Sequence, residues 1–218
     1  MAFSPKYTVT AQMLANLAKI EVIKQQFENQ PISPQLLLSL RESAKVATIH
    51  YSTQIEGNRL TGKEVAEALK GRKLPQREKD EQEVKAYYKA WNAMEEAVVA
   101  NRSFDEKLIA NIHGLVEASK SIIPYRDNQN AIYDSETGAK IYLPPEAKDV
   151  PEMMQDFCQW VQNAENLPVP LVAGIVHYQF VTIHPYYDGN GRTARLLTSF
   201  IMRKGGYGLK GIYSLEEY

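Results

Sequence analysis

The chain has 218 residues, of which 44% are hydrophobic and 23% charged, a composition that is typical of a globular protein and excludes disordered and fibrous classes. Lys and Arg number 25 and Asp and Glu 26, so the net charge of -1 provides no basic field for nucleic acid, and no nucleic-acid partner is expected for this region. Cys158 is the only cysteine, which excludes intramolecular disulfides and multi-cysteine zinc sites and favours a cytoplasmic protein.

Helical spacing of apolar residues, together with N-cap residues and capping boxes, predicts an all-α fold. Ser33 followed by Pro34 opens the second helix. Ser103 with Glu106 forms a capping box for the fifth, and Asp149 caps the sixth. The predicted helices cover about 9–27, 34–55, 61–71, 80–100, 103–119, 149–163, 170–183 and 191–204.

Three segments depart from this pattern. In residues 130–143, two short apolar runs flank a turn at 134–138, which predicts a β-hairpin. The stretch 166–187 lacks Asp, Glu, Lys and Arg, but its prolines and histidines indicate a buried helix that runs into a loop, so no membrane partner is expected. A capping box at 214–217 is followed only by Tyr218, from which we expect that a C-terminal region has been truncated.

The segment 184–195, His-Pro-Tyr-Tyr-Asp-Gly-Asn-Gly-Arg-Thr-Ala-Arg, contains a predicted anion cradle formed by Gly189, Asn190 and Gly191. The two glycines permit close approach of the backbone to a ligand. The helix that follows directs its free N–H groups and the positive end of its dipole at the same point. These features favour a phosphate-binding site.

Four side chains around the cradle supply the expected chemistry. Arg192 and Arg195 lie three residues apart, so both guanidinium groups are expected to lean toward one anion. Asp188 is a hard oxygen donor for Mg²⁺ on a polyphosphate, and His184 could accept a proton near neutral pH. An ordinary turn is disfavoured by this combination of residues. A calcium loop fails because Thr193 stands where the loop requires glycine.

This segment resembles the signature of Fic-domain proteins, His-Pro-Phe-x-Asp/Glu-Gly-Asn-Gly-Arg-x-x-Arg, and differs from it only at Tyr186, which replaces the usual Phe. Because that aromatic packs inward in the family, its hydroxyl needs a partner or a route to water. The hairpin followed by Tyr142-Leu-Pro-Pro145 resembles the flap of these proteins. The resemblance covers about residues 45–205 and implies a Fic-type helical bundle with one small β-hairpin, the flap.

A second motif, Ser52-Thr-Gln-Ile-Glu56-Gly-Asn, precedes the signature. Ser52 and Glu56 share a helical face, and the carboxylate of Glu56 in the last turn is disfavoured by the helix dipole unless a cation lies nearby. The motif resembles the inhibitory motif of Fic proteins, whose glutamate pairs with the second signature arginine, here Arg195. An inhibitory helix over about 34–56 is therefore implied.

The resemblance implies a protein adenylyltransferase that moves AMP from ATP, with Mg²⁺, to a Ser, Thr or Tyr hydroxyl of a target protein. Glu56 on Arg195 would leave ATP in an unproductive pose, and Ile132 and Tyr133 of the flap would pin the target by strand-like pairing. The catalytic assignments it implies are His184 as the base, Asp188 for Mg²⁺ and, around the phosphates, Gly189, Asn190, Gly191, Arg192 and Arg195.

The implied organisation is a set of N-terminal helices over 1–75, which includes the inhibitory helix, and a Fic catalytic core over 76–218. Self-modification is a further expectation, and the oligomeric state is open, a dimer being one option. Two alternative functions remain: a bifunctional or mainly de-adenylylating enzyme, and a nucleotide-binding regulator that lacks a C-terminal DNA-binding domain.

Overall fold

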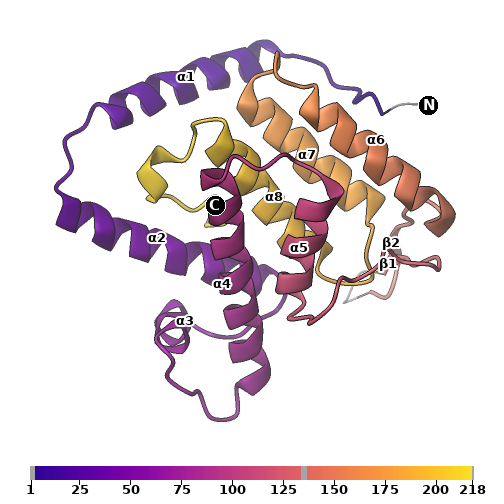
Figure 1. Ribbon diagram of the computed structural model, residues 1–218, viewed down its shortest axis with the longest axis horizontal. Coiled ribbons are helices and arrows are strands. Elements are labelled where there is room, and N and C mark those ends of the chain that lie inside the picture. Colours follow the sequence, from indigo (N-terminus) through magenta and orange to yellow (C-terminus); the bar gives the residue numbers. More distant parts are fainter. Residues whose placement is uncertain (1–2, 134–136, 218) are drawn as a thin grey trace.

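The computed structural model describes residues 3–133 and 137–217 as an assembly of helices with one small hairpin (Figure 1). This confirms the predicted fold class. The elements are α1 (Ala11–Glu28), α2 (Pro34–Ile55), α3 (Gly62–Leu69), α4 (Glu78–Val99), α5 (Glu106–Val116), β1 (Ile132–Tyr133), β2 (Lys140–Tyr142), η1 (Ala147–Asp149), α6 (Val150–Gln162), α7 (Val169–Ile183), α8 (Asn190–Lys204) and η2 (Leu209–Gly211).

α8 lies at the centre of the molecule, where α7, α4 and α5 pack around it (Figure 1). α6 covers α7 on the outside, and α2 with α3 covers α4. One hydrophobic core runs through these helices, from Ile49 of α2 to Phe200 of α8, both of which are fully buried. The second helix of the chain therefore shares the core of the helix that carries the signature arginines.

Two predicted N-caps differ in the structure. Asp105, not Ser103, caps α5, because its backbone is extended (φ -139°, ψ 169°) and its carboxylate accepts the N–H of Leu108 at 2.7 Å. Asp149 precedes α6 but makes no side-chain cap, because it ends η1 in a helical conformation that turns its side chain away from the free N–H groups.

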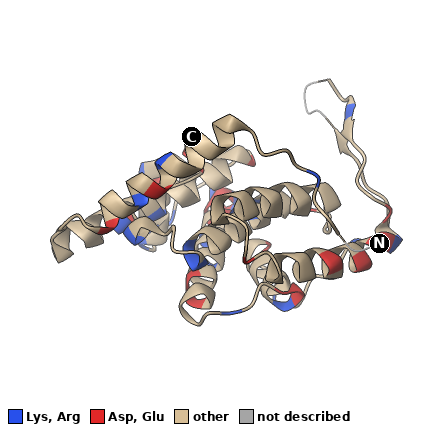
Figure 2. Ribbon diagram, turned by 90° about the horizontal axis from the view of Figure 1, so that it is seen from above, with Lys and Arg blue, Asp and Glu red and all other residues tan. Residues whose placement is uncertain are grey.

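The hairpin projects from the helices (Figure 2). Its antiparallel strands place Ile132 opposite Tyr142 and Tyr133 opposite Lys140. The predicted hairpin is confirmed for these strands, while its turn residues 134–136 lie outside the described residues. Within the described ranges, no helix combines the length and apolar character that a bilayer crossing requires.

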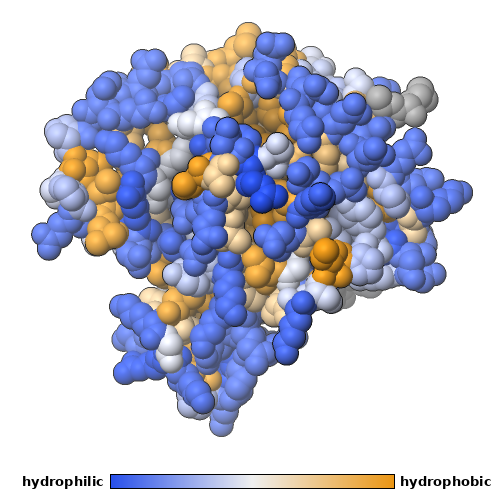
Figure 3. Space-filling model, in the orientation of Figure 1, coloured by the Kyte–Doolittle hydropathy of each residue, from blue (hydrophilic) through white to orange (hydrophobic). Residues whose placement is uncertain are grey.

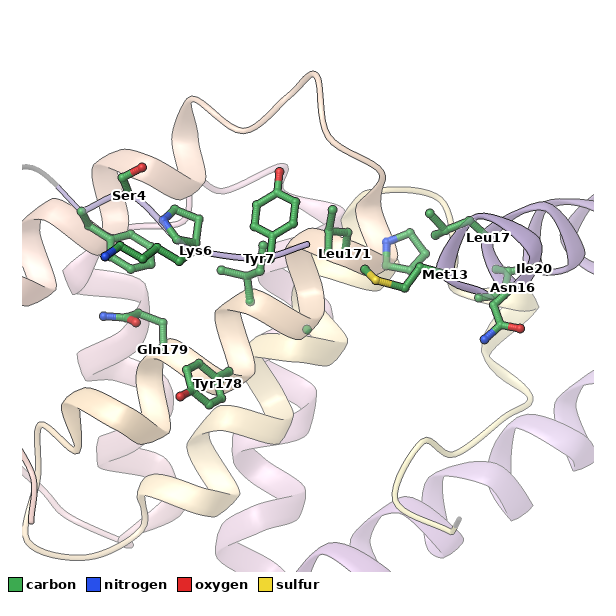
Figure 4. Close-up of a pocket in the computed structure, with 15 residues that line it drawn as sticks. Ser4, Lys6, Tyr7, Met13, Asn16, Leu17, Ile20, Leu171, Tyr178 and Gln179 are labelled. Atoms are coloured by element: carbon green, nitrogen blue, oxygen red, sulfur yellow. The ribbon is translucent and has the colours of Figure 1, made fainter. Parts of the chain in front are cut away.

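α1 differs from the other helices because none of its residues is buried. Leu14, Val22 and Ile23 are each more than half exposed, and apolar side chains gather on the surface over the connection from α1 to α2 (Figure 3). Together with the N-terminal segment and α7, α1 lines an apolar cavity of about 730 Å³. Ser4, Lys6 and Tyr178 are among the lining residues shown in Figure 4. None of the signature residues lines that cavity.

Candidate active site

The signature segment forms the loop between α7 and α8. His184 ends α7 in a left-handed conformation (φ 51°, ψ 60°), and Gly189 starts the turn into α8 with φ 70°. Asn190 closes the loop, since its Oδ1 accepts the N–H of Tyr186 at 3.1 Å and its Nδ2 donates to the carbonyl of Tyr186 at 2.8 Å. The amide of Asn190 was expected to donate to a bound anion. Instead it is buried and holds the loop.

His184 lies half-buried beside the cradle. Burial lowers the pKa of its imidazole, and the positive charge of Arg126 acts in the same direction. The charges of Asp188 and Glu56 oppose this shift. The imidazole is therefore neutral at neutral pH, which is the form that can accept a proton.

Glu56 and Arg195 form an ion pair, with Glu56 Oε1 2.9 Å from Arg195 Nη2. The guanidinium also donates from Nε to Ser52 Oγ at 2.7 Å and from Nη2 to the Ser52 carbonyl at 2.8 Å. Ser52 is fully buried, whereas the carboxylate of Glu56 keeps 30% exposure. The structure thus brings the two motifs together through three contacts to one arginine.

The carboxylate of Glu56 lies directly against the anion cradle. A Cβ atom built on Gly191 would stand 2.5 Å from Glu56 Oε1, so with a larger residue there the carboxylate would have to move. On the other side of the cradle, a Cβ on Gly189 would collide with Glu117 Oε1. Both glycines are therefore already in close contact with oxygen atoms of the protein, in the place where a bound anion is expected.

Arg192 does not lean toward the anion of Arg195, contrary to the sequence-based expectation. It is nearly buried, and its guanidinium is ion-paired with Glu83 at 2.7 Å, Glu117 at 3.1 Å and Asp188 at 3.5 Å. Glu83 lies on α4 and Glu117 at the end of α5, whereas Arg195 is paired with the end of α2, so the two guanidinium groups diverge. The contribution of Arg192 to phosphate binding stays a prediction.

The end of α2 is joined to the same buried network. Asn58 is buried, and its Nδ2 donates to Glu83 Oε2 at 2.9 Å and to the Asp80 carbonyl at 3.0 Å. The other oxygen of Glu83 accepts from Arg192. Glu83 therefore connects the residue two positions after Glu56 to the first turn of α8.

Asp188 fits the expected role at a magnesium ion. Its side chain is 78% exposed, and its Oδ1 accepts the N–H of Gly189 at 2.6 Å, which fixes the carboxylate at the cradle. Mg²⁺ on a polyphosphate uses only one or two carboxylates besides phosphate oxygens and water. In the described parts of the chain, no group of three or more His, Cys, Asp or Glu side chains is arranged to hold a metal ion.

A stacked pair of aromatic rings, one from the signature loop and one from α5, packs against α8. The rings of Tyr186 and His113 lie 3.6 Å apart at an angle of 9°, and His113 Nδ1 lies 3.1 Å from Thr193 Oγ1 on α8. The Tyr186 hydroxyl is buried and has no hydrogen-bond partner in the part of the chain that the structure describes. The described residues thus supply no partner of the kind that this hydroxyl was expected to need.

A polar cavity of about 870 Å³ opens beside the cradle, between the end of α2, α4 and α5. It is large enough for a nucleotide-sized ligand. Its lining includes Glu56, Asn58, Asp188 and Arg192, together with residues of the charged segment 76–83. That charged run showed no functional signal in the sequence because such runs usually form solvated surfaces.

The flap begins and ends next to the loop. Tyr142 of β2 donates its hydroxyl to the Thr182 carbonyl of α7 at 2.9 Å, which ties the hairpin to the helix that ends at His184. Ile132 is partly buried, and Tyr133 is 61% exposed. The strands therefore present side chains and backbone groups close to the candidate base.

Several residues of the site have no motif that could have revealed them. Glu83 and Glu117 pair with Arg192 from 109 and 75 residues away in the sequence, and His113 meets Thr193 from 80 residues away. Arg126 was equally hidden within a loop. One signal was available: an arginine in the first turn of a helix, where the dipole is positive, needs carboxylates nearby.

Residues 103–202 match the model of the Fic/DOC family. A protein adenylyltransferase Fic from Drosophila mojavensis is 27% identical over 181 residues, which cover 78% of this chain and 34% of the relative. The chain thus spans about a third of the length of the curated relatives it matches.

Two solved structures are similar in fold. A Fic family protein from Desulfovibrio desulfuricans G20 superposes with a TM-score of 0.78 at 28% identity and covers 96% of this chain and 62% of its own. A Fic domain containing signaling protein from Bacteroides thetaiotaomicron VPI-5482 has a TM-score of 0.77 at 24% identity, over 88% and 73% of the two chains, and shows the fold alone. Residues 103–202 therefore match the Fic/DOC family in sequence, and the chain is similar in fold to solved Fic proteins.

Proposed function

We propose that this protein transfers AMP from ATP to a hydroxyl group of a protein side chain, and that Glu56 inhibits the transfer. The proposal is carried by one observation: the carboxylate of Glu56, paired with Arg195, lies against the cradle glycine Gly191. An anion site that already holds an internal carboxylate suits an enzyme whose substrate is a polyphosphate and whose basal activity is low.

In the proposed reaction, His184 accepts the proton of the target hydroxyl as the oxygen attacks the α-phosphorus of ATP. The new P–O bond to the target forms while the bond to pyrophosphate breaks, so pyrophosphate leaves with its negative charge. The N–H groups at the start of α8 and the guanidinium of Arg195 stabilise that charge. Asp188 would hold Mg²⁺, which when bound neutralises charge on the phosphates.

The flap is proposed to hold the target chain by pairing with a strand edge, which places the hydroxyl near His184. The exposure of Tyr133 and the bond from Tyr142 to Thr182 support this role. The name of the Drosophila relative, a protein adenylyltransferase, supports a protein as the acceptor.

The inhibited state follows from competition for Arg195. A charge-assisted carboxylate–guanidinium pair contributes about 1.5 to 3 kcal/mol, which corresponds to about 10- to 150-fold in the population of the blocked state. Since Glu56 keeps partial contact with water, the lower end of that range is expected. Removal of the carboxylate therefore raises transfer about tenfold.

The test compares wild type with Glu56→Gly after incubation with ATP and Mg²⁺, by intact-mass analysis of the enzyme and of added lysate proteins. We expect more AMP adduct for Glu56→Gly and a return to background when His184→Ala is added. Ala100→Gly is the matched control, because Ala100 is also a helix C-cap with similar backbone angles but lies outside the site. It should leave transfer unchanged.

Two outcomes would change the assignment. If Glu56→Gly gives no adduct on any protein, the proposed transfer is wrong. If pre-formed adduct disappears with wild type but persists with Glu56→Gly, while the forward rate is unchanged, Glu56 acts in AMP removal. That result would favour the de-adenylylating alternative.

A further inference from the structure

Arg126 is a buried cation without an anionic partner. It lies between α5 and β1, is only 2% exposed, and forms no ion pair with any carboxylate in the ranges 3–133 and 137–217. A guanidinium stays charged at neutral pH, and its burial is costly unless its N–H groups are satisfied. The acceptors that satisfy it therefore indicate why it is there.

These acceptors are neutral oxygens from three separate segments. At the end of α7, Nε donates to the His184 carbonyl at 2.9 Å. In the segment that leads into β1, which we call the first arm of the flap, Nη1 donates to the Asn128 carbonyl at 3.3 Å. In the segment that follows β2, the second arm, Nη2 donates to the Pro145 carbonyl. One side chain thus connects both arms of the flap to the backbone of the candidate base.

We call this set of contacts the joint at Arg126. The backbone of Arg126 and the two residues after it add further contacts. The N–H of Arg126 donates to the Pro185 carbonyl at 2.9 Å. The hydroxyl of Tyr187 donates to Asp127 Oδ1 at 2.6 Å and accepts the N–H of Asn128 at 3.0 Å. The first arm of the flap is therefore held to the signature loop at Arg126 and at the two residues that follow it.

The backbone conformation of His184 indicates what these contacts stabilise. A residue other than glycine at φ 51° is strained, and such strain persists only where the surroundings determine the backbone. The bond from Arg126 to the His184 carbonyl is one such contact. It fixes the backbone of His184 relative to the flap.

We propose that Arg126 is a positioning residue that aligns the flap with His184, so that the target hydroxyl and the base that accepts its proton are placed by one side chain. This inference rests on the proposed function for its catalytic meaning. Arg126 touches neither the cradle nor the polar cavity, so it acts through His184 and the flap alone.

Lysine cannot replace arginine in this joint. A lysine keeps the charge but donates from a single nitrogen, whereas the planar guanidinium reaches carbonyls in three directions. Arg126→Lys therefore separates the geometry of the joint from its charge. Arg203→Lys is the matched control, since Arg203 is also largely buried but pairs with Glu95 at the far end of α8.

The first test measures AMP transfer in a Glu56→Gly background. We expect Arg126→Lys to lower kcat at least about tenfold, because small misplacements of reacting groups carry large rate penalties. The KM for ATP should stay within about twofold, since the cradle is untouched. Arg203→Lys should change neither value. An unchanged kcat, or an equal loss in ATP affinity, would overturn the proposal.

The second test needs no enzymatic activity and so separates this inference from the proposed function. Hydrogen exchange is measured for peptides over 126–133, 137–146 and 183–189. We expect all three to exchange at least about threefold faster in Arg126→Lys and none in Arg203→Lys. Acceleration confined to one segment would show that they are not joined through Arg126.

If Arg126→Lys does not fold, as judged by circular dichroism, Tyr187→Phe takes its place. The side chain of Tyr187 is 56% exposed, so its loss of two hydrogen bonds leaves the core intact. A smaller joint acceleration, about twofold, is expected over 126–133 and 183–189. No acceleration in a folded Tyr187→Phe would overturn the coupling.

Discussion

Arg192 and Arg195 lie one helical turn apart on α8, yet their surroundings differ. Arg192 is nearly buried among three carboxylates, two of which are themselves largely covered. Arg195 forms an ion pair with Glu56, whose carboxylate opens to water. A charge that is buried with several partners is part of the framework, whereas a charge whose partner can leave for solvent can be exchanged for a ligand. The comparison therefore predicts that Arg192 contributes more to stability than Arg195, and it fits the proposed regulation through Arg195.

The largest expected effect is the loss of stability on replacement of Arg192, the arginine with three carboxylate partners. Arg192→Met leaves Glu83 and Glu117 without their cation, and should lower the free energy of unfolding by about 3 kcal/mol. Arg195→Met should lower it by about 1 kcal/mol, because Glu56 can turn to water. Urea denaturation of both variants measures the difference. Equal losses would show that the two arginines have the same structural role.

The second-largest expected effect is a loss of stability at acid pH through His113. Burial, with the charge of Arg192 acting in the same direction, lowers the pKa of His113 to about 4. Its unfolded pKa is about 6.5, so between these values the unfolded state binds a proton that the folded state does not. Stability is therefore lost as the pH falls, by about 2 kcal/mol between pH 7 and pH 5. Denaturation at both pH values tests this, and His113→Gln should flatten the dependence.

A smaller effect is expected at Ser52, which contacts Arg195. Ser52→Ala removes the hydroxyl that accepts from Arg195 but leaves Arg195 available for phosphate. The blocked state should lose about 1 kcal/mol, which corresponds to about fivefold more AMP transfer. Thr53→Ala is the control, because the Thr53 hydroxyl bonds only within α2. Activation by Thr53→Ala to the same extent would indicate a general loosening of α2.

The smallest effect lies beneath the loop. Tyr186→Phe removes a buried hydroxyl that has no partner among the described residues, and should raise stability by about 0.5 to 1 kcal/mol. Tyr125→Phe should lower it, since the hydroxyl of Tyr125 donates to Glu106 at 2.8 Å. Thermal unfolding of both variants decides. A loss on Tyr186→Phe would reveal a water bound to that hydroxyl.

Local features of the molecule were predictable from its sequence. Helix spacing, the proline after Ser33 and the Gly57-Asn58 ending place α2 correctly because caps depend on neighbouring residues. The hairpin strands were predictable for the same reason. The loop at 184–189 was recognisable because its residue types are unusual in combination. Each of these signals is contained within a short window.

The partners of that loop were not predictable because they come from distant windows. The charged run that contains Glu83 looks like any solvated surface until α4 packs beside α8. Arg126 lies in a segment without periodicity, and the three segments that supply its acceptors meet only in the folded chain. The divergence of Arg192 from Arg195 also depends on which helices flank α8. Spacing alone indicated that they share a face and gave no information on their counter-ions.

The anchoring of Asn58 determines how fast the inhibition can respond. The backbone around Glu56 is held by the N–H of Asn58 on the Thr53 carbonyl at 3.1 Å and by the Asn58 side chain on Glu83. Breaking the Glu56–Arg195 ion pair therefore requires a rotamer change of one partly exposed side chain, a motion of picoseconds to nanoseconds, and no movement of α2. In the proposed function, inhibition by Glu56 is then a rapid pre-equilibrium that scales the apparent affinity for the nucleotide, and product should accumulate without a lag from the moment of mixing.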